Sequence, residues 1–152
     1  MTAFSSVERF TPSGPVRMEG MSTELPRLDA AALRALARDH EGRSPCPRCA
    51  GLVCPGWEAI PGGYEKDGLR AVGTLRDPDD EDPTFTEYHP AGSHGWSPDA
   101  PIALSYFPYN RCTVWQCTGC GRPFLRYTEY GGYYVEERVR ELDADLIVEA
   151  NP

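Results

Sequence analysis

The sequence predicts a single α+β domain that is mostly β, and three observations carry this prediction. The chain has 152 residues, of which 15 are glycine and 15 are proline, so many turns and few long elements are expected. Two Cys-x-x-Cys turns, at residues 46–49 and 117–120, each place two thiols close together. A Gly-Gly pair at 131–132 interrupts a run of aromatic and β-branched residues, which is the pattern of a β-hairpin.

The beginning of the chain divides into an arm and a short helix. Residues 1–24 show no hydrophobic periodicity, so a flexible N-terminal arm is expected there, followed by one domain over residues 25–152. Asp29 has the character of an N-cap, and the helix it would begin runs from Ala30 to about His40. The apolar face of this helix would consist of Leu33, Leu36 and Ala37.

A long, loop-rich insertion, about residues 55–100, separates the two cysteine turns. Within it, residues 64–76 are expected to form a hairpin that turns at Asp67-Gly68. Residues 77–82 carry five carboxylates in six positions, and because like charges repel, a solvated loop is predicted. Residues 83–101 are rich in proline, glycine and serine and are expected to be irregular.

The last third of the chain is predicted to consist mainly of strands. Residues 102–107 and 111–116 have strand character, and the second of these segments leads into the second cysteine turn. Residues 124–142 are predicted to form an antiparallel hairpin around Gly131-Gly132. The tail, residues 143–149, would form a helical turn or a last strand.

A two-residue turn at Gly131-Gly132 also predicts the register of the hairpin. Tyr130 would then lie opposite Tyr133, and Phe124 opposite Val139, on one face of the sheet. The other face carries Leu125 and Tyr127 among charged residues, and we expect it to face water or a partner.

The cysteine turns predict a metal site. One tight turn can present two thiols to a tetrahedral ion, so two such turns complete a four-thiolate zinc site. A cysteine turn followed by a strand, a turn and a strand resembles a zinc ribbon, over about residues 44–50 and 101–142. The resemblance implies a zinc-ribbon core with a closed, structural Zn²⁺ and no open coordination position. The implied metal ligands are Cys46, Cys49, Cys117 and Cys120.

The remaining cysteines leave alternatives open. Cys54 and Cys112 are either buried, inert thiols or neighbours of the site that replace one of its ligands. Six cysteines also suffice for an iron–sulfur cluster, although no other feature favours iron. Redox catalysis is disfavoured, because Cys120 leads into a glycine, an arginine and a strand rather than into a helix that would lower its pKa.

Charge and hydropathy exclude some classes of protein. The formal net charge of −8 makes nucleic-acid binding by a basic surface an unfavourable interpretation and suits a basic protein partner. The sequence contains no apolar run near the roughly 18 residues that a membrane helix needs, and the start lacks the apolar core of a secretory signal. We therefore expect a cytoplasmic protein with no membrane partner.

These observations favour a non-enzymatic zinc-binding protein that acts through protein–protein interaction. An immunity or inhibitor protein that neutralises a basic toxin is the specific form expected from the acidic charge. One alternative is a nucleic-acid-associated zinc ribbon, with the aromatic residues stacking on bases. The other is a metal-dependent hydrolase that uses His89 and His94 beside Glu87, although the chain has no HExxH, GxSxG or P-loop motif.

Overall fold

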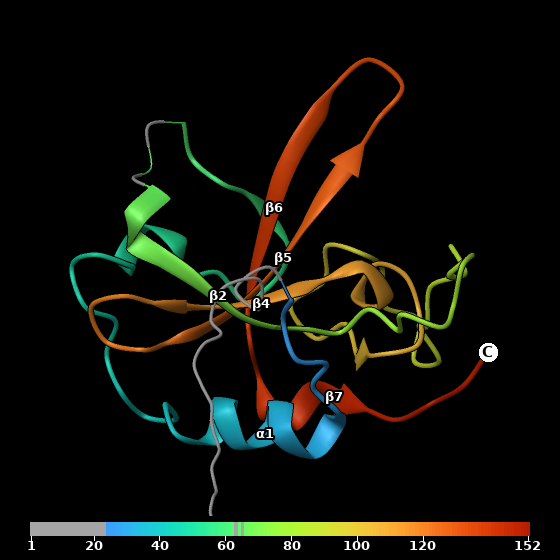
Figure 1. The fold of residues 1–152 in the computed structure, drawn as a ribbon, viewed down its shortest axis with the longest axis horizontal. Helices are drawn as coiled ribbons and strands as arrows, with labels where there is room; N and C mark the ends of the chain where they lie inside the picture. The colour runs from blue at the N-terminus through green and yellow to red at the C-terminus, as the bar shows by residue number, and fades with distance from the viewer. Residues whose placement is uncertain (1–23, 63, 65) are drawn as a thin grey trace, which may run out of the picture.

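The structure is a computed structural model that describes residues 24–62, 64 and 66–152. The predicted arm, residues 1–24, therefore lies outside the described residues except for Glu24. The centre of the fold is a five-stranded antiparallel sheet in the order β1-β6-β5-β4-β2 (Figure 1). Its strands are β1 Glu58–Ala59, β2 Leu69–Thr74, β4 Thr113–Cys117, β5 Pro123–Tyr130 and β6 Val135–Glu141.

Smaller elements surround this sheet. Two short strands, β3 Ile102–Ala103 and β7 Ile147–Val148, pair in parallel beside helix α1 Ala30–Arg38. The described residues also contain four 3₁₀ turns: η2 Ala50–Leu52, η3 Lys66–Gly68, η4 Tyr109–Arg111 and η5 Ala144–Leu146.

Helix α1 is confirmed where the sequence predicted it. The side chain of Asp29 accepts a hydrogen bond of 2.8 Å from the backbone N–H of Ala32, so it caps one of the free donors of the first turn. The chain leaves the helix through Gly42, which has a φ of +77°. Leu33 is fully buried on the face that packs against η5 and β7.

The sheet is covered on both faces, which corrects one sequence prediction. Leu125 and Tyr127 do not face water; they are buried in the larger core cluster together with residues of α1. The residues that cover them come from outside the hairpin: the ring of Trp57 meets that of Tyr127 edge-on at 4.8 Å, and Phe107 does so at 5.9 Å. The opposite face forms a second cluster, in which Phe124 lies among cysteines.

The β5–β6 hairpin is confirmed, but its predicted register is wrong by two residues. Tyr130 pairs with Val135 and Phe124 pairs with Glu141, which leaves four residues, 131–134, in the loop. The two-residue turn of the prediction needs positive φ at both glycines, and neither Gly131 nor Gly132 has one. Because the shift is an even number, every side chain keeps its predicted face.

Two other predicted elements are wrong or shorter than expected. Residues 64–76 do not form a hairpin, because β2 pairs with β4 on one side and is bridged by Arg27 on the other. The strand predicted over 102–107 is reduced to β3, and the strand predicted over 111–116 is confirmed as β4. The tail forms both of the alternatives expected for it, the turn η5 and the strand β7.

Candidate metal centre

Four thiols gather beside the sheet, and they are the four that the sequence predicted to meet. The sulfur atoms of Cys46, Cys49, Cys117 and Cys120 all lie within 4.8 Å of one another. The Sγ–Sγ distance is 3.5 Å for Cys46–Cys117, 3.7 Å for Cys49–Cys120 and 3.9 Å for Cys46–Cys49. A tetrahedral site with metal–sulfur bonds of about 2.3 Å has sulfur–sulfur edges of about 3.8 Å. The donor set therefore fits a zinc ion in both chemistry and size.

The first cysteine turn is built by the backbone of residues 46–52. The carbonyl of Cys46 accepts from the N–H of Cys49 at 3.1 Å and from that of Ala50 at 3.0 Å, which brings both thiols to the same side. The chain then continues directly into η2. Gly51 has no positive φ, so this turn does not depend on a glycine.

The second cysteine turn joins β4 to β5. The N–H of Cys117 donates to the carbonyl of Arg122 at 2.9 Å, and the N–H of Gly121 donates to the carbonyl of Cys117 at 2.8 Å. Gly121 has a φ of +83°, a left-handed conformation that glycine adopts without steric cost. The N–H of Gly119 donates to the sulfur of Cys117 at 3.3 Å.

The fold changes the pKa of two thiols in opposite directions. Burial alone would raise the pKa of Cys46, but hydrogen bonds from backbone amides and from the Cys117 thiol outweigh it and lower this pKa to about 6. Burial, together with the neighbouring Cys120 thiol, raises the pKa of Cys49 to about 12. Four thiols this close cannot all ionise without a positive charge between them, and a divalent metal supplies that charge.

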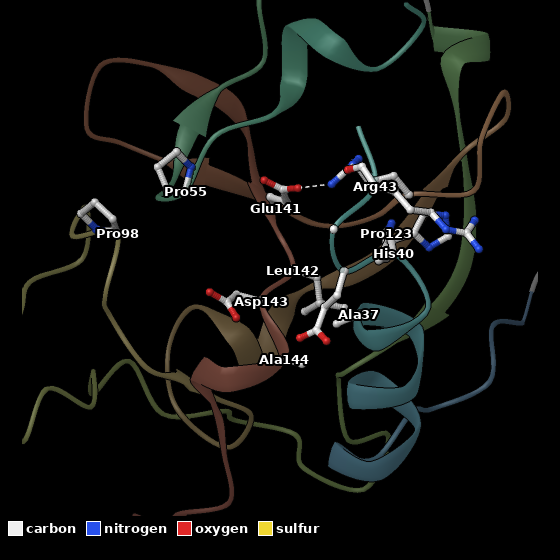
Figure 2. A pocket seen from close by; sticks show the side chains of 13 residues that line it. Ala37, His40, Arg43, Pro55, Pro98, Pro123, Glu141, Leu142, Asp143 and Ala144 are labelled. Atoms are coloured by element: carbon white, nitrogen blue, oxygen red, sulfur yellow. Dashed lines mark hydrogen bonds and ion pairs between the residues drawn. The ribbon is translucent and has the colours of Figure 1, made fainter. Parts of the chain in front are cut away.

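A second set of contacts, which the sequence did not reveal, fixes the position of the second turn. Nε2 of His40, just after α1, lies 2.9 Å from the carbonyl oxygen of Cys120. A carbonyl only accepts, so Nε2 carries the proton. Arg122 is buried and bridges the carboxylate of Glu141 to the carbonyl of Arg43. His40, Arg43, Arg122 and Glu141 line the hollow in Figure 2. Their contacts link the end of the helix, the second cysteine turn and β6.

Cys54 and Cys112 lie apart from the four-thiol cluster. The thiol of Cys54 donates to the carbonyl of Leu52 at 3.1 Å, and burial raises its pKa to about 11. The thiol of Cys112 donates to the carbonyl of Pro108 at 3.3 Å inside the larger core cluster, and burial raises its pKa well above the usual value. Of the two interpretations left open by the sequence, the structure favours buried, inert thiols.

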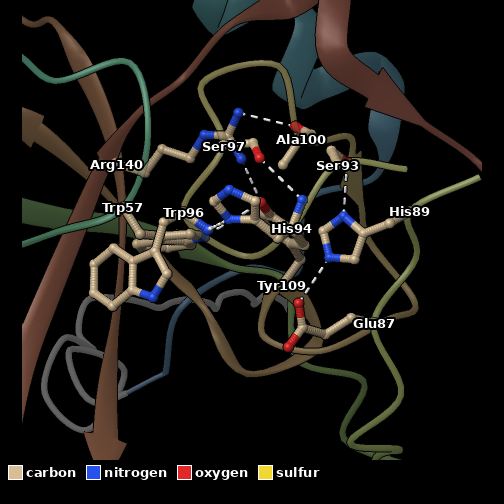
Figure 3. A network of polar contacts seen from close by, with 10 residues as sticks. All are labelled: Trp57, Glu87, His89, Ser93, His94, Trp96, Ser97, Ala100, Tyr109 and Arg140. Atoms are coloured by element: carbon tan, nitrogen blue, oxygen red, sulfur yellow. Dashed lines mark hydrogen bonds and ion pairs between the residues drawn. The ribbon is translucent and has the colours of Figure 1, made fainter. Parts of the chain in front are cut away.

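Glu87, His89 and His94 of the predicted hydrolase do not form a metal-ligating group, and Figure 3 shows the separate hydrogen bonds that the two histidines make. His89 lies between the carboxylate of Glu87, at 2.7 Å from Nε2, and the hydroxyl of Ser93, at 2.8 Å from Nδ1. His94 instead accepts from the N–H of Trp96 at 3.3 Å. Within residues 24–62, 64 and 66–152, the cysteine cluster is the only group of three or more potential metal-ligating side chains. The metal-dependent hydrolase therefore gains no geometric support.

Comparison of the chain with protein families, curated proteins and solved structures found no match. In the described part of the chain, no helix has the length and apolar character needed to cross a membrane.

Proposed function

We propose that the chain is a zinc-binding protein, that its metal is structural, and that it acts by binding another protein. The observation that carries the proposal is the cluster of four thiols, whose sulfur atoms lie within 4.8 Å of one another. Four sulfur ligands fill a tetrahedral zinc ion and leave no position for a substrate, so the role of the metal is to hold the fold together. The proposal includes the zinc-ribbon core that the sequence resembles.

The support for a protein partner comes from the tip of the β5–β6 hairpin, which projects from the body of the molecule (Figure 1). Four large hydrophobic side chains are exposed at this tip, and they are Tyr130, Tyr133, Tyr134 and Val135. Exposed aromatic residues that lie together mark interaction sites more often than isolated ones do. Tyrosine also loses little conformational entropy when it is buried in an interface.

The narrower form of the proposal is an inhibitor of a basic toxin. Its support is the net charge of −8 and the carboxylates of residues 77–82, which are mostly exposed. Such a surface would steer a basic partner toward the protein.

Affinity capture from the source cells tests the interaction. Wild-type protein is expected to recover a partner in stoichiometric amount, and Tyr133→Ser is expected to weaken this recovery, because it removes the most exposed ring of the tip. Tyr133→Phe is the matched control and should retain the partner. Recovery of no stoichiometric protein, or equal recovery by Tyr133→Ser, would count against the proposal.

A further inference from the structure

The outer edge of β5 is open near the tip of the hairpin. The last pair between β4 and β5 joins Thr113 to Arg126, so Thr128 and Tyr130 extend beyond the end of β4. In the part of the chain that the structure describes, no backbone hydrogen bond reaches these two residues from that side. The open edge is therefore a template for another strand.

The hydrogen-bond pattern shows which backbone groups face this edge. In an antiparallel ladder, the N–H and C=O groups of successive residues point alternately to the two neighbours. The carbonyl of Glu137 accepts from Ile60 at 3.0 Å, so the groups of Glu137 point away from β5. Thr128 is the partner of Glu137, and Tyr130 lies two residues further, so the N–H and C=O groups of both point outward from β5.

A hollow of about 420 Å³ lies along the open edge, and residues 128–130 form one of its sides. Phe85 and Phe107 contribute aromatic surface to it, with ring centroids 5.4 Å apart. Phe85 is 71% exposed, an unusual state for a phenylalanine that already has an aromatic neighbour. The hollow therefore offers apolar contacts beside unsatisfied backbone groups.

The hollow is also locally basic in an acidic protein. The guanidinium of Arg111 lies 4.1 Å from the ring centroid of Phe85, and Arg76 lines the same hollow. Among the residues that the structure describes, neither arginine forms an ion pair, although the chain has 23 carboxylates. The one carboxylate that lines the hollow, Glu129, is paired with Arg138 at 3.2 Å. Arg76 is exposed, and half-buried Arg111 donates to the carbonyl of Pro83 at 2.5 Å, so the positive charge of neither is neutralised by a carboxylate among the described residues.

We propose that this edge groove, formed by residues 128–130 with Arg76, Phe85, Phe107 and Arg111, binds an extended peptide segment with carboxylate side chains. This inference rests on the broader proposed function, the binding of another protein, and not on its narrower toxin-inhibitor form, because the segment it names carries carboxylates. The peptide would add a strand to β5 through the outward groups of Thr128 and Tyr130. Its apolar side chains would lie on the two phenylalanines, and its carboxylates would meet the two guanidinium groups.

Titration of ¹⁵N-labelled protein with synthetic peptides tests the groove. Two peptides of the same length are compared. One alternates valine with glutamate, and the other alternates valine with lysine. The glutamate peptide is expected to shift the amide signals of Thr128 and Tyr130 with a Kd of about 1 mM or tighter. The lysine peptide should bind more weakly, because it lacks the negative charge that the two arginines would bind. A glutamate peptide that is N-methylated at alternate residues should also bind more weakly, because it lacks the backbone donors.

A charge reversal provides the matched comparison. Arg76→Glu is expected to weaken binding of the glutamate peptide by about fivefold or more, as the loss of an exposed ion pair predicts. Arg70→Glu reverses an equally exposed charge on β2 that does not line the groove, and it should leave the affinity unchanged. Both positions are exposed, so the fold tolerates either change.

Three results would overturn the proposal. The first is that the glutamate peptide leaves the amide signals of Thr128 and Tyr130 unshifted. The second is that the lysine peptide binds as tightly as the glutamate peptide, and the third is that an oligouridylate binds at the same amides more tightly than the glutamate peptide does. Zinc content measured on the same sample separates the two proposals. A zinc-loaded, folded protein that ignores the glutamate peptide refutes the groove alone, whereas a folded protein without zinc that binds the peptide refutes the structural zinc and leaves the groove.

Discussion

Cys120 belongs to the four-thiol cluster and Cys54 does not, so the same substitution at each position tests which thiols bind the metal. Cys120→Ser leaves three thiolates, so zinc binding weakens, and zinc binding supplies folding free energy. The expected loss is comparable with the whole free energy of unfolding of a small domain, about 5–15 kcal/mol. We expect Cys120→Ser to be insoluble or to lack a cooperative melting transition.

Cys54→Ser is the control for this substitution. Its hydroxyl can still donate to the carbonyl of Leu52, and the cost of burying it is about 1–2 kcal/mol. Zinc content should stay at the wild-type value. A soluble, cooperatively melting Cys120→Ser protein, or a zinc-free Cys54→Ser protein, would contradict the assignment of ligands.

Substitutions at Gly121 and Gly51 compare the two cysteine turns at the residue scale. Gly121→Ala forces a side chain into the left-handed region, at φ +83°, and should lower the free energy of unfolding by about 1–2 kcal/mol. Gly51 has no positive φ, and a methyl group there meets no atom within 4 Å. Gly51→Ala should therefore leave the stability unchanged or raise it by up to about 1 kcal/mol. Urea unfolding measures both, and equal effects would show that the second turn does not need its glycine.

At the scale of elements, the end of α1 is tied to the second cysteine turn through His40. His40→Ala removes the hydrogen bond to the carbonyl of Cys120 and should lower the free energy of unfolding of the zinc-loaded protein by about 1 kcal/mol. Competition with a chelator should show faster zinc loss, because partners outside the ligand shell hold it in place. His40→Gln keeps a side-chain donor and should restore part of the effect. Zinc loss from His40→Ala at the wild-type rate would show that this contact does not support the metal centre.

Elements with local signals could be predicted from the sequence. Asp29 and the apolar positions after it predicted α1. The β5–β6 hairpin was also predicted, but its register was not, because Gly-Gly fits several loop lengths and only the tertiary packing selects one.

Features that depend on distant packing could not be predicted. The burial of Tyr127 is decided by Trp57 and Phe107, which have no periodic relation to it in the sequence. The contact between His40 and Cys120 spans 80 positions and likewise has no local signal. The meeting of the four thiols was predictable despite their separation, because metal-site chemistry restricts which cysteines pair.

At the scale of the whole molecule, a metal bound at the four thiols would stabilise one of the two core clusters more than the other. The cluster with the thiols also holds Leu52, Phe124 and Val139, whereas α1 belongs to the other cluster. Removal of zinc by a chelator should lower the Tm and reduce hydrogen-exchange protection at Phe124 and Val139 before that at Leu33. An unchanged Tm, or loss of protection at Leu33 first, would contradict this order.

The proposed zinc site also predicts how stability varies with pH. A bound metal lowers the pKa of its thiolate ligands below the value in the unfolded chain. Such groups add stability above their unfolded pKa and lose it as the pH falls through the folded value. The Tm of the zinc-loaded protein should therefore fall as the solution is acidified, with release of zinc in the same range. A Tm that falls while zinc stays bound would assign the acid sensitivity to other groups.

The most direct test of the central claim is the metal content of each chain, measured by elemental mass spectrometry on protein purified without added metal. The proposed structural site predicts close to one zinc per chain. A folded protein with no metal and with free or oxidised thiols would contradict the structural zinc site and make thiol chemistry the leading explanation of the cluster.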